Sequence, residues 1–297
     1  MRFGGRRSSD NVEFREGGGG GGFGFGGGSG GGAGMLLGVV FSRFGIGGVV
    51  VLLIAFAIFG GLGSLTGGGG QQAVGPGTQQ SGTRTCQTEP TITFACQTLA
   101  STEDHWTALF AANGQRYAPP RMVIFEGRDQ SSCGTADARM GPFYCPADQG
   151  IYLDIAFFRE LAQRFAAPGD FAQAYVIAHE VGHHVQTLAG TSDRIRQAQS
   201  AAREGQANAL QVRMELQADC YAGVWAARER GAMEPGDLEE GMRAAAAIGD
   251  DTLQRAERGV VVPESFTHGS AAQRQEALMR GYRGGNPQAC EAFTEGI

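Results

Sequence analysis

Residues that can bind zinc are concentrated in one short segment of the chain, AYVIAHEVGHHVQ at residues 174–186. It holds three of the five histidines, and His179, Glu180 and His183 form the pattern His-Glu-x-x-His, the two-histidine zinc signature of metallopeptidases. Side chains four residues apart leave the same face of a helix, so His179 and His183 can bind one ion together. Glu180 can reach a water molecule at that ion and take its proton. The segment therefore predicts zinc-dependent hydrolysis.

A catalytic zinc site needs a third protein ligand and an open position for water. Glu215 is the best candidate, because it lies on a long predicted helix in the segment ELQAD at residues 215–219. Asp219 shares its helix face and can accept an N–H from a ligating histidine, which fixes that ring. Small residues nearby would let the two helices approach closely: Ala218, Ala222 and Gly223. The alternative for the two carboxylates is a solvated helix face with ion pairs.

The remaining histidines have weaker indications. His268 lies in a loop before the last predicted helix, where it either stabilises the oxyanion of the reaction or caps the loop. Tyr221 and Tyr144 are weaker candidates for the same role. His184 lies about 100° around the helix from its neighbour and is expected to pack or hydrogen-bond elsewhere. His105 is expected to be an ordinary surface or packing residue.

These side chains must be positioned by a mainly helical domain of the α+β class with a small sheet. A strand is predicted at residues 121–126, and a hairpin at 142–154 around the turn signal Asp-Gln-Gly. The predicted helices are 101–115, 154–165, 170–190, one starting at 192 or 193, 206–230, 235–247 and 270–283.

A stretch of 22 uncharged residues, 44–65, precedes this domain. As a helix it is about 33 Å long, which matches a bilayer core, and we expect it to be an uncleaved transmembrane helix rather than a core helix or a signal peptide. Residues 1–43 are then a cytoplasmic, glycine-rich disordered tail, 66–84 a flexible linker and 85–297 the folded domain. The arginines that precede the span place the N-terminus in the cytoplasm by the positive-inside rule: Arg2, Arg6, Arg7, Arg15 and Arg43.

Cysteine usage supports export of the domain. The chain has six cysteines, and all lie beyond residue 80, which fits disulfides in an oxidising compartment, periplasmic or extracellular. Six cysteines allow 15 pairings. A cysteine-rich metal site is the competing interpretation, but the sequence has no Cys-x-x-Cys. The net charge of −6 and the absence of a basic stripe argue against a nucleic-acid partner.

Five segments together carry a family resemblance: MRFGGRRSSDNVE, FYCPADQGIYLD, AYVIAHEVGHHVQ, ELQADCYAGVWA and THGSAAQR. They resemble the neutral zinc metallopeptidase family of bacterial membrane-anchored proteins, over nearly the whole chain outside the glycine tracts. The resemblance implies a zincin-like domain that binds Zn²⁺ through His179, His183 and Glu215, with Glu180 as catalytic base. The segment ELQAD is also similar to the third-ligand motif of gluzincins. The resemblance brings no substrate.

The disulfide pairing is a hypothesis built on separation along the chain. Cys86–Cys96 and Cys133–Cys145 are local pairs, 10 and 12 positions apart. Cys220 would then join Cys290 and tie the metal-binding helix to the C-terminus.

The leading interpretation is a zinc peptidase in the inner membrane that acts on a peptide or protein substrate outside the cytoplasm. The alternative is a non-catalytic envelope protein whose structural zinc stabilises a domain that binds a partner protein or the cell wall. A zinc amidase on cell-wall peptides would share the chemistry of the first. Glu180 favours an enzyme, because a structural zinc site has no need of it.

Overall fold

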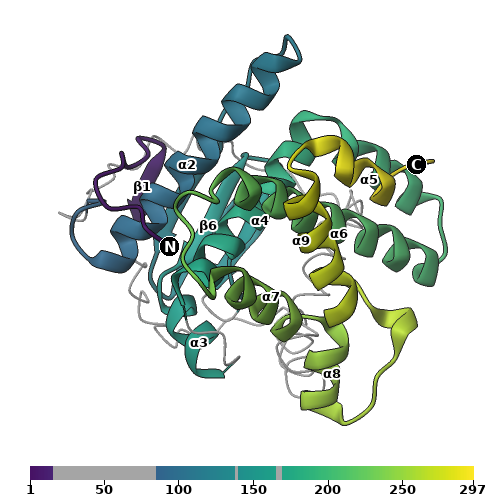
Figure 1. The fold of residues 1–297 in the computed structure, drawn as a ribbon. Coiled ribbons are helices and arrows are strands. Elements are labelled where there is room, and N and C mark those ends of the chain that lie inside the picture. The colour runs from purple at the N-terminus through teal and green to yellow at the C-terminus, as the bar shows by residue number, and fades with distance from the viewer. Residues whose placement is uncertain (16–84, 138–139, 165–168) are drawn as a thin grey trace, which may run out of the picture.

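The computed structural model describes residues 1–15, 85–137, 140–164 and 169–297. The predicted membrane helix at 44–65, the linker at 66–84 and the glycine-rich part of the tail lie outside these residues. Within the described residues, no helix is both long enough and apolar enough to span a bilayer. The chain there is mainly helical with a small sheet, as predicted (Figure 1).

The main sheet has the strand order β1-β2-β6-β5. The strands β1 (Val12–Arg15), β2 (Arg121–Phe125) and β6 (Gly150–Asp154) run parallel. β5 (Phe143–Cys145) is antiparallel to β6, so the predicted strand at 121–126 and the predicted hairpin at 142–154 are confirmed. A separate two-stranded sheet, β3 (Arg128–Ser131) with β4 (Gly134–Asp137), was not predicted from these short polar segments.

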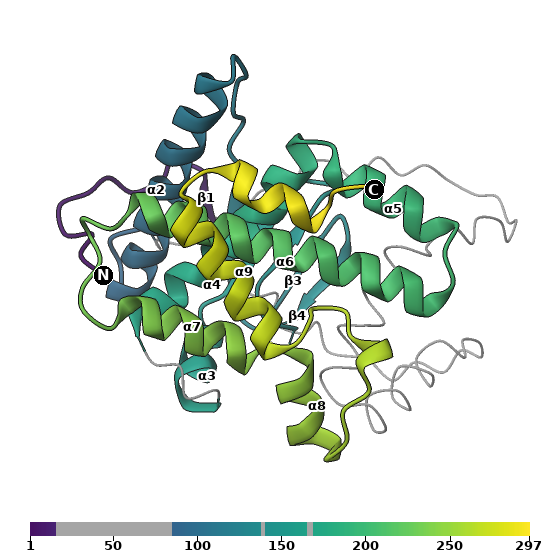
Figure 2. The same ribbon diagram turned by 45° about the vertical axis from the view of Figure 1, so that its right-hand side comes forward.

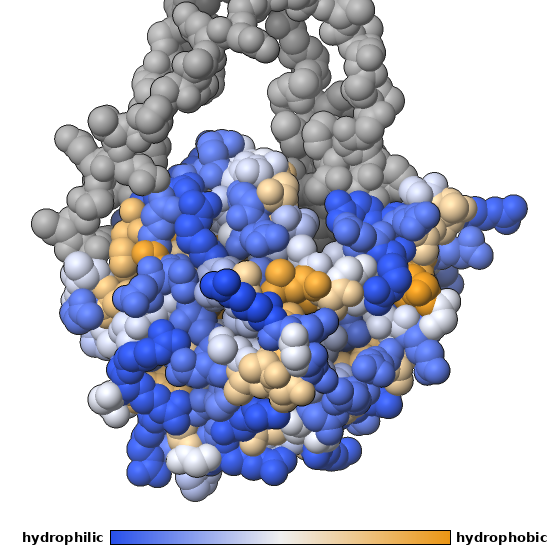
Figure 3. Space-filling view, turned by 90° about the horizontal axis from the view of Figure 1, so that it is seen from above, coloured by the Kyte–Doolittle hydropathy of each residue, from blue (hydrophilic) through white to orange (hydrophobic). Residues whose placement is uncertain are grey.

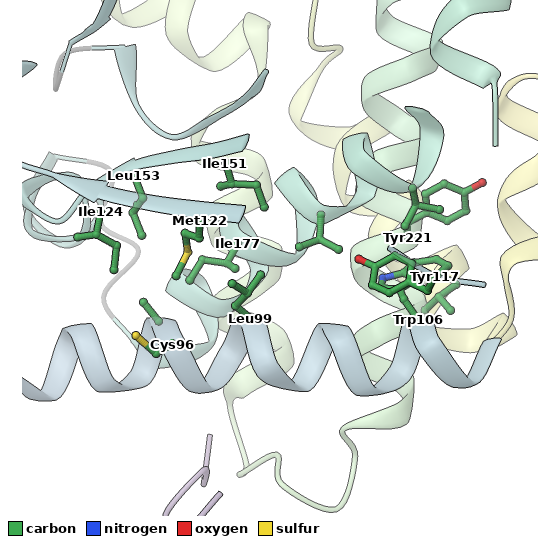
Figure 4. Close-up of a cluster of buried hydrophobic side chains, with 14 of the residues drawn as sticks. Cys96, Leu99, Trp106, Tyr117, Met122, Ile124, Ile151, Leu153, Ile177 and Tyr221 are labelled. Carbon is green, nitrogen blue, oxygen red and sulfur yellow. The ribbon is translucent and has the colours of Figure 1, made fainter. Parts of the chain in front are cut away.

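Side chains of the central strands alternate between two buried faces. Met122 and Ile124 belong to the main core cluster, whereas Val123 and Phe125 belong to a second cluster on the opposite face. This is the period-two alternation of a strand. Figure 4 shows the main cluster, where the strand residues meet Leu99 and other side chains from the helices. The central strands are therefore buried on both faces, and helix residues such as Leu99 pack against one of these faces.

The described residues contain eight α-helices and two short 3-10 helices. They are α2 (Pro90–Ala112), α3 (Ala156–Arg164), α4 (Asp170–Leu188), α5 (Thr191–Ser200), α6 (Glu204–Arg228), α7 (Asp237–Ala247), α8 (Asp250–Arg258), α9 (Ala271–Gly284), η2 (Pro263–Ser265) and η3 (Pro287–Phe293). The structure differs from the predicted helices at two places. The helix predicted at 101–115 begins eleven residues earlier, because Pro90 suits a first helical turn and Ile92, Cys96 and Leu99 are buried on its inner face. The short, charged helix α8 was not predicted.

The central helices α4, α6 and α9 cross one another (Figure 2), and glycine and alanine let them approach closely. A Cβ atom on Gly182 of α4 would lie 2.9 Å from the backbone oxygen of Ala218 on α6, so these two helices touch backbone to backbone. Gly223 of α6 and Gly281 of α9 make an equally close contact, since a Cβ on Gly223 would overlap Leu278 O. The predicted role of small residues holds for Ala218, whereas Gly223 serves the contact with α9.

All three predicted disulfides are present: Cys86–Cys96, Cys133–Cys145 and Cys220–Cys290. The last one joins α6 to the C-terminal η3. No cysteine of the chain is left free.

Most large apolar side chains of the domain are used in its core. Figure 3 shows one face of the molecule, on which the described residues are mainly hydrophilic and apolar colour is confined to small patches. Over the whole described part of the chain, the exposed large apolar side chains are Val260 and Val262, in the loop after α8.

Residues 1–15 fold onto the domain, so the prediction of a disordered tail at 1–43 is wrong for this part. β1 pairs with β2, with Val12 opposite Met122. Phe3 is 3% exposed, and its ring lies 5.3 Å from the ring of Phe94 on α2. The segment is polar and flanked by glycine, so its composition suggested disorder. The open edge of β2 supplies the pairing that such a short strand lacks by itself.

We expect Phe3→Ala to lower the free energy of unfolding of the full chain by about 3 kcal/mol, because it removes a buried aromatic ring. Gly4→Ala is the matched control, since Gly4 is exposed and an added methyl group would meet no atom within 4 Å. Urea denaturation measures both. Equal, small effects of the two changes would show that residues 1–15 do not pack on the domain.

Candidate metal centre

Three predicted ligand side chains converge from two helices. His179 and His183 leave α4, and Glu215 leaves α6 opposite them. Glu215 Oε2 lies 3.2 Å from His179 Nε2 and 3.4 Å from His183 Nε2. One ligand atom from each residue lies within 4.8 Å of the others, which is a separation that a single metal ion can bridge. His179 and Glu215 are buried, and His183 is partly buried.

The hydrogen bonds of the two imidazoles fit a bound cation. His179 Nδ1 lies 2.8 Å from the Asp219 carboxylate, to which it donates, and His183 Nδ1 lies 2.9 Å from the amide oxygen of Gln186. In neutral rings both Nε2 atoms then carry a lone pair toward Glu215 Oε2. Three electron-pair donors pointing at one another repel unless a cation lies between them. Two imidazole nitrogens with one carboxylate are a donor set that zinc prefers.

The charged groups of this cluster shift the pKa values of Glu215 and His179. Burial alone would raise the pKa of Glu215, but positive charge at His183 and the close contacts with both histidines hold it well below its usual value. Burial would lower the pKa of His179, yet the Asp219 charge and hydrogen bond raise it to about 10. Both pKa shifts show that the surroundings favour positive charge between Glu215 and the histidines.

Asp219 is a carboxylate of the site that accepts hydrogen bonds from residues on two other helices. It is fully buried and accepts hydrogen bonds from His179, from the Tyr175 hydroxyl at 2.5 Å and from Arg274. Arg274 Nε lies 2.9 Å from Oδ2 and Arg274 Nη2 3.0 Å from Oδ1, so the pair is bidentate. Burial would raise the pKa of Asp219, but the charges of Arg274 and His179 lower it. Asp219 thus holds the ring of His179 while α9 neutralises its charge.

Sequence reasoning missed the amides that orient the other ligands. Gln186 is fully buried, and its Nε2 donates to Met214 O at 2.7 Å, which leaves its oxygen for His183. Gln211 Nε2 donates to Glu215 Oε1 at 3.0 Å, which leaves Oε2 for the metal position. Gln186 could have been found from its place three residues after His183, and Gln211 from its place four residues before Glu215. Arg274 has no such local signal, because it lies 55 positions from Asp219.

Glu180 lies beside the three ligands and is 7% exposed. Burial raises its pKa, although the charges of the two histidines and a backbone hydrogen bond from Tyr144 on β5 oppose the change. A raised pKa suits a carboxylate that accepts a proton and later returns it.

His184 holds strand β5 through a hydrogen bond with Tyr144. Its Nε2 lies 2.7 Å from Ala118 O, to which it donates, so its Nδ1 accepts from the Tyr144 hydroxyl at 3.1 Å. Burial lowers the pKa of His184, which is consistent with a neutral ring. As expected from helix geometry, His184 is not part of the ligand cluster. It fixes Tyr144, and through it the edge strand beside Glu180.

His268 approaches the site from the loop before α9. The Asp250 carboxylate accepts the backbone N–H groups of Thr267, His268 and Gly269, and this shapes the loop. His268 Nδ1 lies 3.5 Å from Asp250 Oδ1, and the ring is 24% exposed. Burial would lower its pKa, but Asp250 and the nearby charge of Glu215 raise it. The loop packs against α6 beside Glu215, because a Cβ atom on the adjacent Gly269 would lie 3.3 Å from Val212 and 3.4 Å from Leu216.

Other candidates lie elsewhere. Tyr221 is packed in the core, edge-on to Trp106 at 5.3 Å, and His105 is bonded to the buried Glu229. A second group of acidic residues in the described part of the chain could also bind a metal. It consists of Asp170, Asp237 and Glu240. The Met1 amino group lies 2.6 Å from Asp170 and 3.1 Å from Asp237, so this cluster already has a cation.

Comparison with known proteins agrees with this donor set. A family model described as "Putative neutral zinc metallopeptidase" matches residues 1–293. The chain belongs to this family of zinc metallopeptidases. The matched range includes the N-terminal segment and the loop of His268.

Relatives of this chain are known by sequence. YpfJ of Escherichia coli K12, named as an uncharacterized protein, is 44% identical over 302 residues and covers all of both chains. Rv2575 of Mycobacterium tuberculosis H37Rv, also named as uncharacterized, is 45% identical over 192 residues, which is 60% of this chain and 64% of that protein. No solved structure matches the chain at a significant level.

We expect Gln186→Leu to weaken zinc binding about 10- to 100-fold, because His183 loses the partner that fixes its ring. Competition with a zinc-binding dye measures the affinity. Gln197→Leu is the same change at an exposed position of α5 and should leave the affinity unaltered. Equal affinity of the two variants would show that Gln186 does not orient a ligand.

Proposed function

We propose that this protein is a zinc-dependent peptidase whose metal is held by His179, His183 and Glu215. The observation that carries the proposal is the convergence of three electron-pair donors with a buried carboxylate, Glu180, beside them. Two ligands from α4 and one from α6, with Glu180 after the first histidine, also support a zincin-like arrangement. A purely structural zinc has no need of that carboxylate.

Zinc bound at these side chains would lower the pKa of a water molecule to about 7 and polarise the peptide carbonyl. Glu180 takes the proton of the attacking water and passes it to the leaving amine. Its burial beside two histidines raises its pKa and so suits it to carry a proton transiently.

His268 stabilises the negative charge that develops on the carbonyl oxygen. Two features support this role: Asp250 raises the pKa of the ring, which favours its protonated form, and Asp250 also fixes the loop that carries it. The ring is partly exposed, as a group that meets substrate must be.

We also propose that the domain acts outside the cytoplasm and is attached to the inner membrane. Three disulfides support an oxidising compartment. The 22 uncharged residues at 44–65 support attachment to a lipid bilayer. A peptide or protein in that compartment would be the substrate.

We expect Glu180→Gln to retain zinc and lose peptidase activity by about 10²- to 10⁴-fold, since an amide cannot accept the proton. The full chain, with residues 1–15 included, is incubated with a peptide library, and products are identified by mass spectrometry with zinc and with a chelator. Glu204→Gln, the same change at an exposed position of α6, is the control and should cleave normally.

If the parent chain binds zinc and cleaves nothing under any condition, the enzyme assignment fails. The protein would then be a non-catalytic envelope protein with a structural zinc. Cleavage that persists in Glu180→Gln would instead refute the role of Glu180.

We expect His268→Asn to lower kcat about 100-fold with little change in KM, because the group acts on charge present only in the transition state. Zinc content and thermal midpoint should match the parent chain. An unchanged kcat would leave His268 as a loop residue without a part in the reaction.

A further inference from the structure

The N-terminal segment, residues 1–15, is built into the domain by backbone hydrogen bonds at three places. Arg2 N donates to Ala232 O at 2.8 Å, Ser9 N to Cys96 O at 3.1 Å, and Asn11 O accepts from Met122 N at 2.8 Å. β1 then continues the sheet in parallel with β2. Without this segment, β2 would be an open edge strand whose side chains are almost fully apolar and buried.

The arginines of the segment are paired with carboxylates of the domain. The pairs are Arg2–Glu234 at 3.0 Å, Arg6–Glu229 at 2.6 Å, Arg7–Glu103 at 2.9 Å and Arg15–Asp129 at 2.9 Å. These are four of the five arginines that the positive-inside rule counts toward a cytoplasmic N-terminus. Their charge therefore has a second explanation, which is complementarity to an acidic surface of the domain itself.

Two of these carboxylates are buried, so their pairing is specific. Glu103 is 6% exposed, and its side-chain hydrogen bonds in the described structure come from Ser9, Asn11 and Arg7. Glu229 is 2% exposed. Burial would raise its pKa, but hydrogen bonds from His105, Ser101 and Arg6 lower it to about 2. A buried charge needs such partners, because an unpaired one is costly.

These contacts are incompatible with a chain that crosses a membrane once. Paired strands lie about 4.8 Å apart, whereas the hydrocarbon core of a bilayer is about 30 Å thick. A single crossing at 44–65 would place residues 1–15 and the domain on opposite faces. We infer that residues 1–15 lie on the same side of the membrane as the metal centre. This inference is independent of peptidase activity.

Thiol labelling of the full chain in spheroplasts tests the inference. All six native cysteines are in disulfides, so a new cysteine is the one free thiol. Asp10→Cys reports on the N-terminal segment and Gln115→Cys on the domain, and both positions are exposed. Each variant is treated with a membrane-impermeant maleimide before and after permeabilisation, with a cytoplasmic thiol protein as the control for sealed membranes.

We expect both positions to show the same fraction of labelling, within about 20%, before permeabilisation and after it. Asp10→Cys that is protected until permeabilisation, while Gln115→Cys is already labelled, would overturn the inference. The reverse pattern would overturn it as well. Neither result depends on whether the protein cleaves peptides, so the outcome is separate from that of the proposed function.

Discussion

The buried carboxylate of Asp219 is the interaction on which the arrangement of the site depends. It has no contact with solvent and is surrounded by the His179 ring, the Tyr175 hydroxyl and the Arg274 guanidinium. A buried anion is tolerated only when opposite charge and hydrogen bonds replace its lost hydration. Here those partners come from two helices, α4 and α9, while Asp219 itself lies on α6, so satisfying one charge also fixes how the three helices meet.

Close helix contacts make this convergence possible. Gly182, inside the histidine motif, touches Ala218, which precedes Asp219, and Gly281 touches Cys220, which follows it. The disulfide of Cys220 with Cys290 ties the same point of α6 to the end of the chain. The third ligand Glu215, the carboxylate Asp219 and the disulfide-bonded Cys220 therefore all lie within two turns of α6. The rest of the domain, including the sheet that is buried on both faces, supports this part of α6.

The parts of the site that could be predicted from the sequence are those that helix geometry places locally. The four-residue spacings of His179 with His183 and of Glu215 with Asp219 put each pair on one helix face, and the structure brings these faces together. Arg274 could not be found this way, since its position depends on how α9 crosses α6.

In the fold, too, the elements that could be predicted are those with a local sequence pattern, and those that depend on contacts with distant residues were missed. The strand at 121–126 and the hairpin have strong β-type patterns and were recovered. β1 is polar, short and next to glycine, and becomes a strand because β2 offers it an edge. α8 is short and strongly charged, and its apolar residues are only Leu253 and Ala256, which are too few to mark a helix by their spacing. The membrane segment at 44–65 lies outside the described residues and stays a prediction.

The central claim is that Asp219 and its neighbours prepare an open, three-ligand zinc site. A crystal structure of the zinc-loaded full chain, with anomalous data at the zinc edge, tests this most directly. The account predicts one ion about 2.0–2.2 Å from His179 Nε2, His183 Nε2 and Glu215 Oε2, with a non-protein oxygen as fourth ligand. A fourth protein ligand at that ion, or an ion bound at Asp170 and Asp237 with none at His179, would contradict it.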